Sequence, residues 1–208
     1  MDVIDVTGAP SAPDTPLALV LAAGAGSRMG GPKLFARVRG AAFSVHIGRA
    51  LDGLGWRTVW VLRAPQQADE LAALLGRPPV FCVNPDPGGD MLSSVVTGLR
   101  APAARLARVL CVWPVDFPLV SAETLTRLAD GMGQVDAVLP AHQGRTGNPL
   151  IVRRHVLCRW LSVMPHDGLR QAMREHPVRL NLVEVPDDGP LRNLNTTADC
   201  LTAEDRPE

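Results

Sequence analysis

The sequence predicts an α/β fold in which helices cover both faces of a mostly parallel sheet. Its 208 residues are 46% apolar and 20% charged, a composition typical of a globular domain with a substantial core. Apolar segments alternate with amphipathic segments along the chain, as in repeated strand–helix units. The early apolar segments are continuously apolar, which is typical of strands buried on both faces. Together these observations favour a three-layer α/β/α, doubly wound sandwich.

The elements follow from local composition. Residues 1–15 are rich in Asp, Pro, Ala and Ser and lack periodicity, so we expect a flexible N-terminal arm before a single domain over residues 16–208. Runs of apolar residues predict strands, and apolar residues at helical spacing predict helices. The predicted strands cover residues 17–23, 58–63, 80–84, 108–113, 137–140, 150–152 and 180–185. The predicted helices cover residues 43–54, 66–75, 91–99, 122–131, 154–161 and 169–176.

A glycine-rich segment follows the first predicted strand and reads LAAGAGSRMGGPK over residues 21–33. Its glycines allow the backbone to approach a ligand closely and to adopt positive φ angles. Consecutive free N–H groups in such a loop form an anion-binding concavity, and Arg28 and Lys33 add positive charge beside it. Because ligands of such sheets bind beyond the carboxyl ends of the strands, the segment predicts a diphosphate or triphosphate site there.

Two common phosphate loops do not fit this spacing. The dinucleotide fingerprint needs a third glycine where Met29 stands, and an acidic residue near the end of the second strand, where the chain has Arg63. The P-loop needs a Gly-Lys-Ser/Thr sequence, whereas a proline separates Gly31 from Lys33. A nicotinamide-dependent oxidoreductase is therefore disfavoured.

The loop resembles the LAAGxGxRMGxPK signature of the MobA/MocA-like nucleotidyltransferases, which include molybdenum cofactor cytidylyltransferase. The resemblance extends over about residues 16–201 and implies a Rossmann-like nucleotidyltransferase fold. The chain departs from the family pattern at Asp90, Asn148, Asn193 and Asn195. The further segments that resemble family motifs are residues 91–99, 116–120, 147–150, 168–170 and 194–199.

The resemblance implies that a substrate oxygen attacks the α-phosphorus of a nucleoside triphosphate and that pyrophosphate leaves. This chemistry depends on positioning and charge neutralisation. The implied catalytic residues are Arg28, Lys33 and Asp116, and Mg²⁺ would lie on Asp116 and Asn195. Asp116 also follows an apolar run, at the carboxyl end of a predicted strand. The implied nucleotide-binding residues are Leu21, Ala22, Ala23, Gly24, Gly26 and Ser94.

The residue types by themselves leave alternatives open. Asp116 also suits a turn before Pro118, Asn195 suits a cap of the last helix, and Ser94 suits a first helical turn. The departures from the family pattern also suggest a second hypothesis, a nucleotide-binding partner protein with weakened catalysis.

The Ala-Ala-Gly form of the loop favours CTP over GTP, again by resemblance. The implied acceptor is a phosphorylated small molecule such as molybdopterin, with Asn148 and Arg170 on the acceptor side. Asn148 replaces a family histidine in the segment that distinguishes the pterin-directed enzymes, so another acceptor stays open, as does a guanylyltransferase. A molybdoenzyme could be the client of the product.

Composition argues against several other classes. The 21 Lys and Arg residues balance 21 Asp and Glu residues, so nothing favours nucleic acid or a membrane surface as a partner. The cysteines and histidines lack the spacing of a metal site. The first 16 residues do not resemble a signal peptide, and no apolar run reaches the ~18 residues of a membrane span. We expect a cytoplasmic protein.

Overall fold

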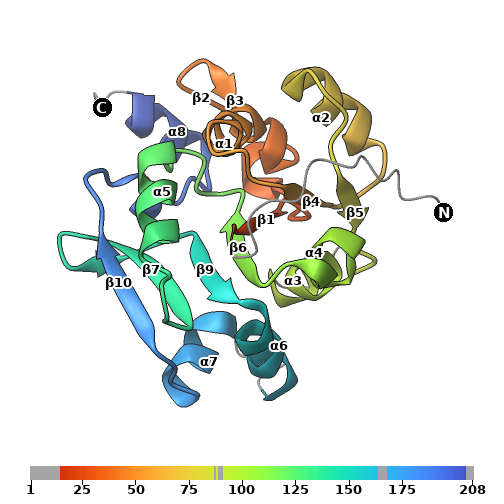
Figure 1. The fold of residues 1–208 in the computed structure, drawn as a ribbon. Coiled ribbons are helices and arrows are strands. Elements are labelled where there is room, and N and C mark those ends of the chain that lie inside the picture. Colours follow the sequence, from red (N-terminus) through yellow and green to blue (C-terminus); the bar gives the residue numbers. More distant parts are fainter. Residues whose placement is uncertain (1–14, 87, 89–90, 164–167, 205–208) are drawn as a thin grey trace.

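The computed structural model describes residues 15–86, 88, 91–163 and 168–204. Its centre is an eight-stranded sheet with the order β10-β7-β9-β6-β1-β4-β5, in which β8 pairs with β7 (Figure 1). Only β9 and β8 run antiparallel to their neighbours in this sheet. The strands of the sheet are β1 (Leu17–Leu21), β4 (Thr58–Leu62), β5 (Phe81–Val83), β6 (Val109–Pro114), β7 (Ala137–His142), β8 (Arg145–Thr146), β9 (Leu150–Arg153) and β10 (Leu180–Glu184).

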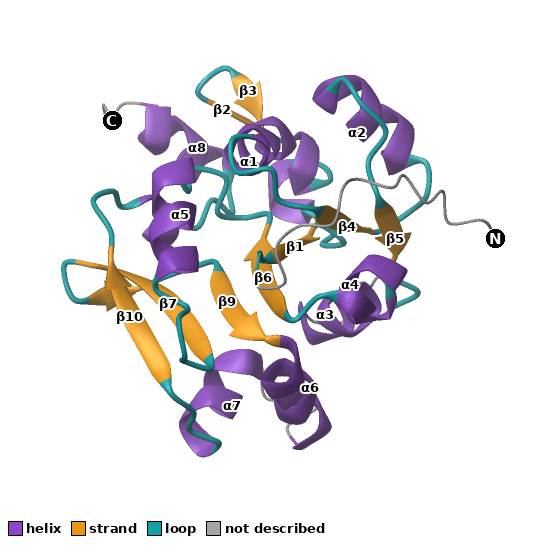
Figure 2. Ribbon diagram, viewed as in Figure 1, coloured by secondary structure: helices purple, strands orange, loops and turns teal. Residues whose placement is uncertain are grey.

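Helices cover both faces of the sheet, which confirms the predicted fold class (Figure 2). Alternate residues of β1 point to opposite faces, so Ala18 and Val20 belong to one core cluster and Leu19 to the other. The first cluster includes residues of α1, α2, α5 and α8, and the second includes residues of α3, α4, α6 and α7. The helices are α1 (Phe43–Asp52), α2 (Gln67–Leu75), α3 (Met91–Arg100), α4 (Pro102–Leu106), α5 (Ala122–Asp130), α6 (Arg154–Val163), α7 (Gly168–Glu175) and α8 (Thr197–Glu204).

The predicted strands and helices are all present, with ends that differ by at most two residues. The sequence reading did not include helix α4, strand β8 or a small hairpin formed by β2 (Arg37–Val38) and β3 (Ala41–Ala42). These elements are too short to produce a clear period. The predicted arm lies almost wholly in residues 1–14, which, like Asp90, are outside the described residues.

The carboxyl ends of β1, β4, β5 and β6 meet at one edge of the sheet because these strands are parallel neighbours. The glycine-rich loop follows β1, and Asp116 follows β6 two residues after its end. The register places Leu21 beside Pro114, so the two segments leave the sheet side by side. This edge is where the predicted phosphate site and the predicted metal ligand come together.

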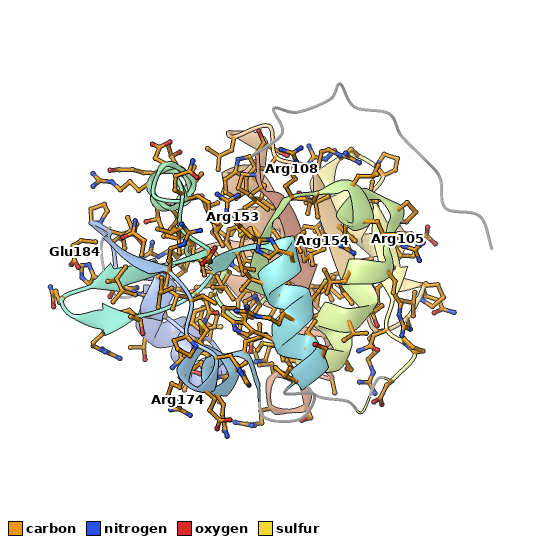
Figure 3. All side chains as sticks on the ribbon, turned by 60° about the horizontal axis from the view of Figure 1, so that its bottom comes forward. Arg105, Arg108, Arg153, Arg154, Arg174 and Glu184 are labelled. Carbon is orange, nitrogen blue, oxygen red and sulfur yellow. The ribbon has the colours of Figure 1, made fainter. Side chains whose placement is uncertain are left out.

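Arginine side chains gather near the opposite edge, where Arg108 precedes β6, Arg153 ends the antiparallel β9 and Arg154 begins α6 (Figure 3). Val109 is in register with Arg153, and the N–H of Arg154 donates to the carbonyl of Arg108 at 2.8 Å. These cations therefore lie too far along the strands to act at the carboxyl edge. Within the described ranges, no helix is long and apolar enough to cross a lipid bilayer.

Candidate active site

A cleft with a volume of about 340 Å³ opens at the carboxyl edge of the sheet. Its walls come from the glycine-rich loop, the end of β6, the start of α3 and the segment before α8. These segments are distant in the sequence, so the fold assembles the cleft. The predicted site residues that line it are Leu21, Ala23, Gly24, Gly26, Arg28, Lys33, Ser94, Asp116 and Asn195.

Ala22 is the predicted nucleotide-binding residue that does not line the cleft. Its N–H donates to the carbonyl of Val61 at 2.9 Å, so the backbone at Ala22 still follows the direction of β1. Strand alternation directs the side chain of Ala22 into the core, where it is 1% exposed.

The glycine-rich loop curls around Gly26. The carbonyl of Gly26 accepts hydrogen bonds from the N–H groups of Met29 at 2.8 Å and Gly31 at 3.3 Å. Gly26 itself has φ +62°, and a Cβ atom there would overlap the carbonyl oxygen of Gly31. Only glycine fits this position without moving the loop. Gly24 differs, because a Cβ there would meet no protein atom within 4 Å.

The backbone N–H groups of residues 24–28 donate to no other residue that the structure describes. Consecutive donors that lack a partner among the described residues can form an anion-binding concavity. Arg28 is exposed, and its guanidinium has no partner within the described ranges. The loop thus presents both backbone donors and a full positive charge to the cleft.

Lys33 connects the loop to two other walls of the cleft. Its Nζ atom lies 2.8 Å from Oδ2 of Asp116 and donates to Oδ1 of Asn195 at 2.7 Å. The Lys33 side chain is 15% exposed and the Asp116 side chain 29%, so the three groups lie at a partly buried position. The ammonium marks a point at which one cation touches both oxygens.

The side chain of Asn195 is not the cap of the last helix. Its oxygen accepts from Lys33, whereas Thr196 caps α8 by accepting from the N–H of Asp199 at 3.2 Å. In return, Oδ2 of Asp199 accepts from the N–H groups of Asn195 and Thr196, both at 2.8 Å. This reciprocal arrangement is a capping box with an additional bond to Asn195.

The hydrogen bond from the Asn195 backbone is the main reason that the pKa of Asp199 lies below its ordinary value, and Thr196 lowers it further. Asp199 therefore holds the segment that presents Asn195 to the cleft. The sequence analysis missed this residue, although a Thr three positions before an Asp is the signal of a capping box.

A second residue missed from the sequence is Asn84, which follows β5 and lines the cleft. It is 3% exposed, and its Nδ2 donates to the hydroxyls of Ser93 at 2.9 Å and Ser94 at 3.1 Å. Its Oδ1 accepts from Thr97 at 3.4 Å and from the N–H of Asp86 at 3.0 Å. The network fixes Ser94 both in the first turns of α3 and in the cleft wall. The available signal was a polar amide at the end of a predicted strand.

The two residues predicted on the acceptor side do not line this cleft. Asn148 lies before β9, where the Asn148–Pro149 peptide bond is cis and the N–H of Asn148 donates to the carbonyl of Pro190 at 2.9 Å. Arg170 is exposed on α7 and has no partner in the part of the chain that the structure describes. Asn148 lies at the same edge of the sheet as the cleft, because β9 is antiparallel to β6 and begins there.

The described histidines and cysteines do not line the cleft. Among the described residues, no group of three His, Cys, Asp or Glu side chains could hold a metal ion. Nδ1 of His142 bonds to the carbonyl of Val185 at 2.9 Å. Burial raises the pKa of Cys82 to about 11 and the pKa of Cys111 still further. These thiols are therefore protonated and inert near neutral pH.

Three solved structures illustrate the similarity of this chain to known proteins. Mth528, a nucleotidyl transferase from Methanothermobacter thermautotrophicus, is 26% identical, with 92% of this chain and 96% of that chain covered and a TM-score of 0.75. Rv0371c from Mycobacterium tuberculosis H37Rv, in complex with manganese, is 19% identical. The match covers 93% of this chain and 100% of that chain, with a TM-score of 0.70. Molybdopterin-guanine dinucleotide biosynthesis protein A from Archaeoglobus fulgidus is 20% identical. The match covers 90% of this chain and 96% of that chain, with a TM-score of 0.63.

No curated protein sequence matches the chain. The similarity to Rv0371c and to the Archaeoglobus protein shows the fold alone, since both are below 25% identity. A sequence family gives the wider assignment, because the MobA-like NTP transferase domain matches residues 18–196 and thus includes the loop, Asp116 and Asn195. This chain therefore belongs to the MobA-like NTP transferase domain family and is a nucleotidyltransferase.

Proposed function

We propose that this nucleotidyltransferase uses Mg²⁺ to transfer CMP from CTP to a phosphorylated small molecule, with release of pyrophosphate. Molybdopterin is the first acceptor to test. The observation that carries the proposal is the position of Lys33, whose ammonium touches Asp116 and Asn195 beside five N–H groups that donate to no described residue. A triphosphate and its cation need such a combination of donors, positive charge and oxygen ligands.

In this proposal the N–H groups of residues 24–28 bind phosphate oxygens, and Arg28 and Lys33 neutralise the charge that develops as pyrophosphate leaves. Arg28 offers a planar fork of donors, whereas Lys33 supplies a point charge. Both cations belong to the loop that carries the N–H groups, so one segment of the chain would position the whole triphosphate. Positioning and electrostatics are the main demands of this reaction.

The proposed ligands for Mg²⁺ are Asp116 and Asn195. A carboxylate and an amide supply oxygen atoms, which Mg²⁺ prefers, and the remaining ligands would be water and phosphate. The ammonium of Lys33 already lies between the two oxygens, which supports this as a cation position. When bound, Mg²⁺ supplies charge stabilisation to the phosphates. The manganese complex of Rv0371c is consistent with a divalent cation at this fold.

The choice of CTP rests on the Ala-Ala-Gly form of the loop, and the cleft wall supports a nucleotide on Leu21, Ala23 and Ser94. GTP is the competing donor, since one similar structure is a molybdopterin-guanine dinucleotide biosynthesis protein. On the acceptor side we place Asn148, near the cleft edge, and Arg170, on α7.

A pyrophosphate-release assay tests the proposal. The protein is incubated with Mg²⁺ and each of the four nucleoside triphosphates, with and without molybdopterin. We expect acceptor-dependent release that is highest with CTP and that Asp116→Ala reduces by about 10²-fold or more. A matched control is Asp130→Ala, which removes an exposed carboxylate from the end of α5. Equal release by wild type and Asp116→Ala would contradict the assignment.

One observation favours a second candidate, a nucleotide-binding partner protein with weakened catalysis. Asn195 contributes a neutral amide to the proposed metal position, so this position carries the charge of Asp116 alone. Tight binding of a triphosphate without turnover, over a panel of phosphorylated acceptors, would support this second candidate. Robust turnover with any acceptor would eliminate it.

A further inference from the structure

We infer that Lys33 occupies the metal position of the free protein and makes binding of a divalent cation conditional on the nucleotide. In this arrangement the ammonium holds Asp116 and Asn195 until a triphosphate draws it away, and the cation then takes the two oxygens. The inference rests on the proposed function, because it concerns the same cleft. It adds an order of binding, in which the triphosphate displaces the ammonium before the cation takes its place.

The distances make the two occupants mutually exclusive. The ammonium nitrogen is 2.8 Å from the Asp116 oxygen and 2.7 Å from the Asn195 oxygen, so it uses both groups at once. Mg²⁺ takes oxygen ligands at about 2.1 Å, so it would need the same space between the two oxygens. Two cations at such close range also repel each other strongly in a partly buried site.

The surrounding charges explain why the free protein favours the ammonium. The groups that face it are the carboxylate of Asp116 and, at longer range, the carboxylate of Asp199, whose pKa Lys33 helps to lower. Asn195 adds only a neutral oxygen. With one carboxylate in direct contact, the attraction for a divalent cation is modest, and the tethered ammonium has no entropy of association to lose.

A triphosphate reverses this balance. Its phosphates would bind at the N–H groups of residues 24–28, and the backbone of Lys33 packs against this loop, since a Cβ at Gly26 would lie 3.1 Å from the Lys33 nitrogen. The flexible lysine side chain can therefore turn from Asp116 to a phosphate without movement of the backbone. The triphosphate brings several negative charges, which attract the ammonium and supply further oxygen ligands to the cation.

The backbone segments that carry the two oxygens are held by hydrogen bonds that do not involve Lys33. The N–H of Leu194 donates to the carbonyl of Asp116 at 2.8 Å, and Asp199 holds the backbone of Asn195. Removal of the ammonium should thus leave Asp116 and Asn195 in place and open to a metal ion. This separation of roles makes a lysine substitution a clean test.

The test is a titration of the full chain with Mn²⁺ alone, without nucleotide, in which EPR measures the free ion. We expect Lys33→Met and Lys33→Gln to bind Mn²⁺ at least about tenfold more tightly than wild type. The matched control is Arg28→Met, which removes one positive charge from the same loop. The Arg28 side chain does not contact Asp116 or Asn195. This variant should bind Mn²⁺ as weakly as wild type. Adding Asp116→Asn to Lys33→Met should abolish the gain and assign it to this position.

Wild type that binds Mn²⁺ alone as tightly as the Lys33 variants would overturn the inference. An equal gain in Arg28→Met would also overturn it, because the effect would then reflect general charge in the cleft. Using two different lysine substitutions, each checked for folding by circular dichroism, guards against one that fails to fold. No step needs CTP or turnover, so failure of the pyrophosphate assay and failure of this titration are separate results.

Discussion

The ammonium of Lys33 donates a hydrogen bond of 2.7 Å to the side-chain oxygen of Asn195, although the two residues are 162 positions apart in the chain. This contact links two walls of the cleft, the glycine-rich loop and the segment before α8. It also brings the amide oxygen to the cation position that Asp116 shares. The charge at position 195 should therefore determine how strongly the cleft attracts cations.

Asn195→Asp adds a second carboxylate to this position. We expect Mn²⁺ in the presence of a triphosphate to bind roughly tenfold more tightly than to wild type, because two carboxylates attract a divalent cation more strongly than one. Isothermal titration calorimetry with a non-hydrolysable triphosphate measures the change. Asn195→Ala should bind Mn²⁺ more weakly than wild type. Identical affinities in all three proteins would show that residue 195 does not contact the ion.

The two glycines at 24 and 26 should separate stability from binding. Gly26→Ala forces a Cβ into the carbonyl of Gly31 at a positive φ, so we expect about 1–3 kcal/mol of lost stability together with lost nucleotide affinity. Gly24→Ala meets no protein atom within 4 Å, so its thermal unfolding should match wild type. Because Gly24 lines the cleft, its affinity for a fluorescent triphosphate should still fall. Equal melting temperatures for both variants would contradict the loop geometry.

Asn84→Ala should destabilise the protein by about 1–3 kcal/mol, because it removes the hydrogen bonds of Asn84 to the buried hydroxyls of Ser94 and Thr97. It should also weaken nucleotide binding, since Asn84 lies in the cleft wall and holds Ser94. Thr97→Val is the matched control, because it removes one bond of the same network from a residue outside the cleft wall. For both variants, urea unfolding measures the stability and nucleotide titration measures the affinity. A loss of affinity in Thr97→Val equal to that in Asn84→Ala would assign the effect to packing.

The pKa of Asp199 lies below its ordinary value because its carboxylate accepts hydrogen bonds from Asn195 and Thr196. A lowered pKa in the folded state means that the charged form stabilises the fold above the ordinary value of 3.8. This contribution is lost as the pH falls through the lowered pKa. Asp199→Asn should therefore be less stable than wild type at pH 7, and the difference should shrink below about pH 4. Unfolding in urea at both pH values measures it, and a difference that does not vary with pH would rule out this electrostatic origin.

Most of the fold could be predicted from the sequence because its signals are local. Short continuous apolar runs such as β1 and β6 are typical of strands that are covered on both faces, and the helical periods between them are clear. Local patterns do not reveal the direction of a strand in its sheet. The sequence therefore did not predict that β9 lies between β6 and β7 and runs antiparallel to both. Short elements such as α4 lack a period to recognise.

The candidate site also has features that the local sequence reveals and features that depend on contacts between distant segments. The glycine spacing and the cations Arg28 and Lys33 are visible in one continuous segment, and Asp116 follows an apolar run. The roles of Asn84 and Asp199 depend on partners from other segments or on a backbone N–H group, which the residue type does not reveal. Ala22 lies in the recognised loop, yet strand alternation directs it into the core.

The sequence by itself therefore determined the layered α/β architecture, the glycine-rich loop after the first strand and the family, because each depends on neighbouring residues or on a long continuous pattern. Only the tertiary structure decided that Lys33 bridges Asp116 and Asn195. That contact joins the ends of segments from three separate parts of the chain. It arises from the order of strands in the sheet and from hydrogen bonds between backbone groups, such as Leu194 to Asp116. Such an arrangement depends on packing of the whole domain, and no local pattern encodes it.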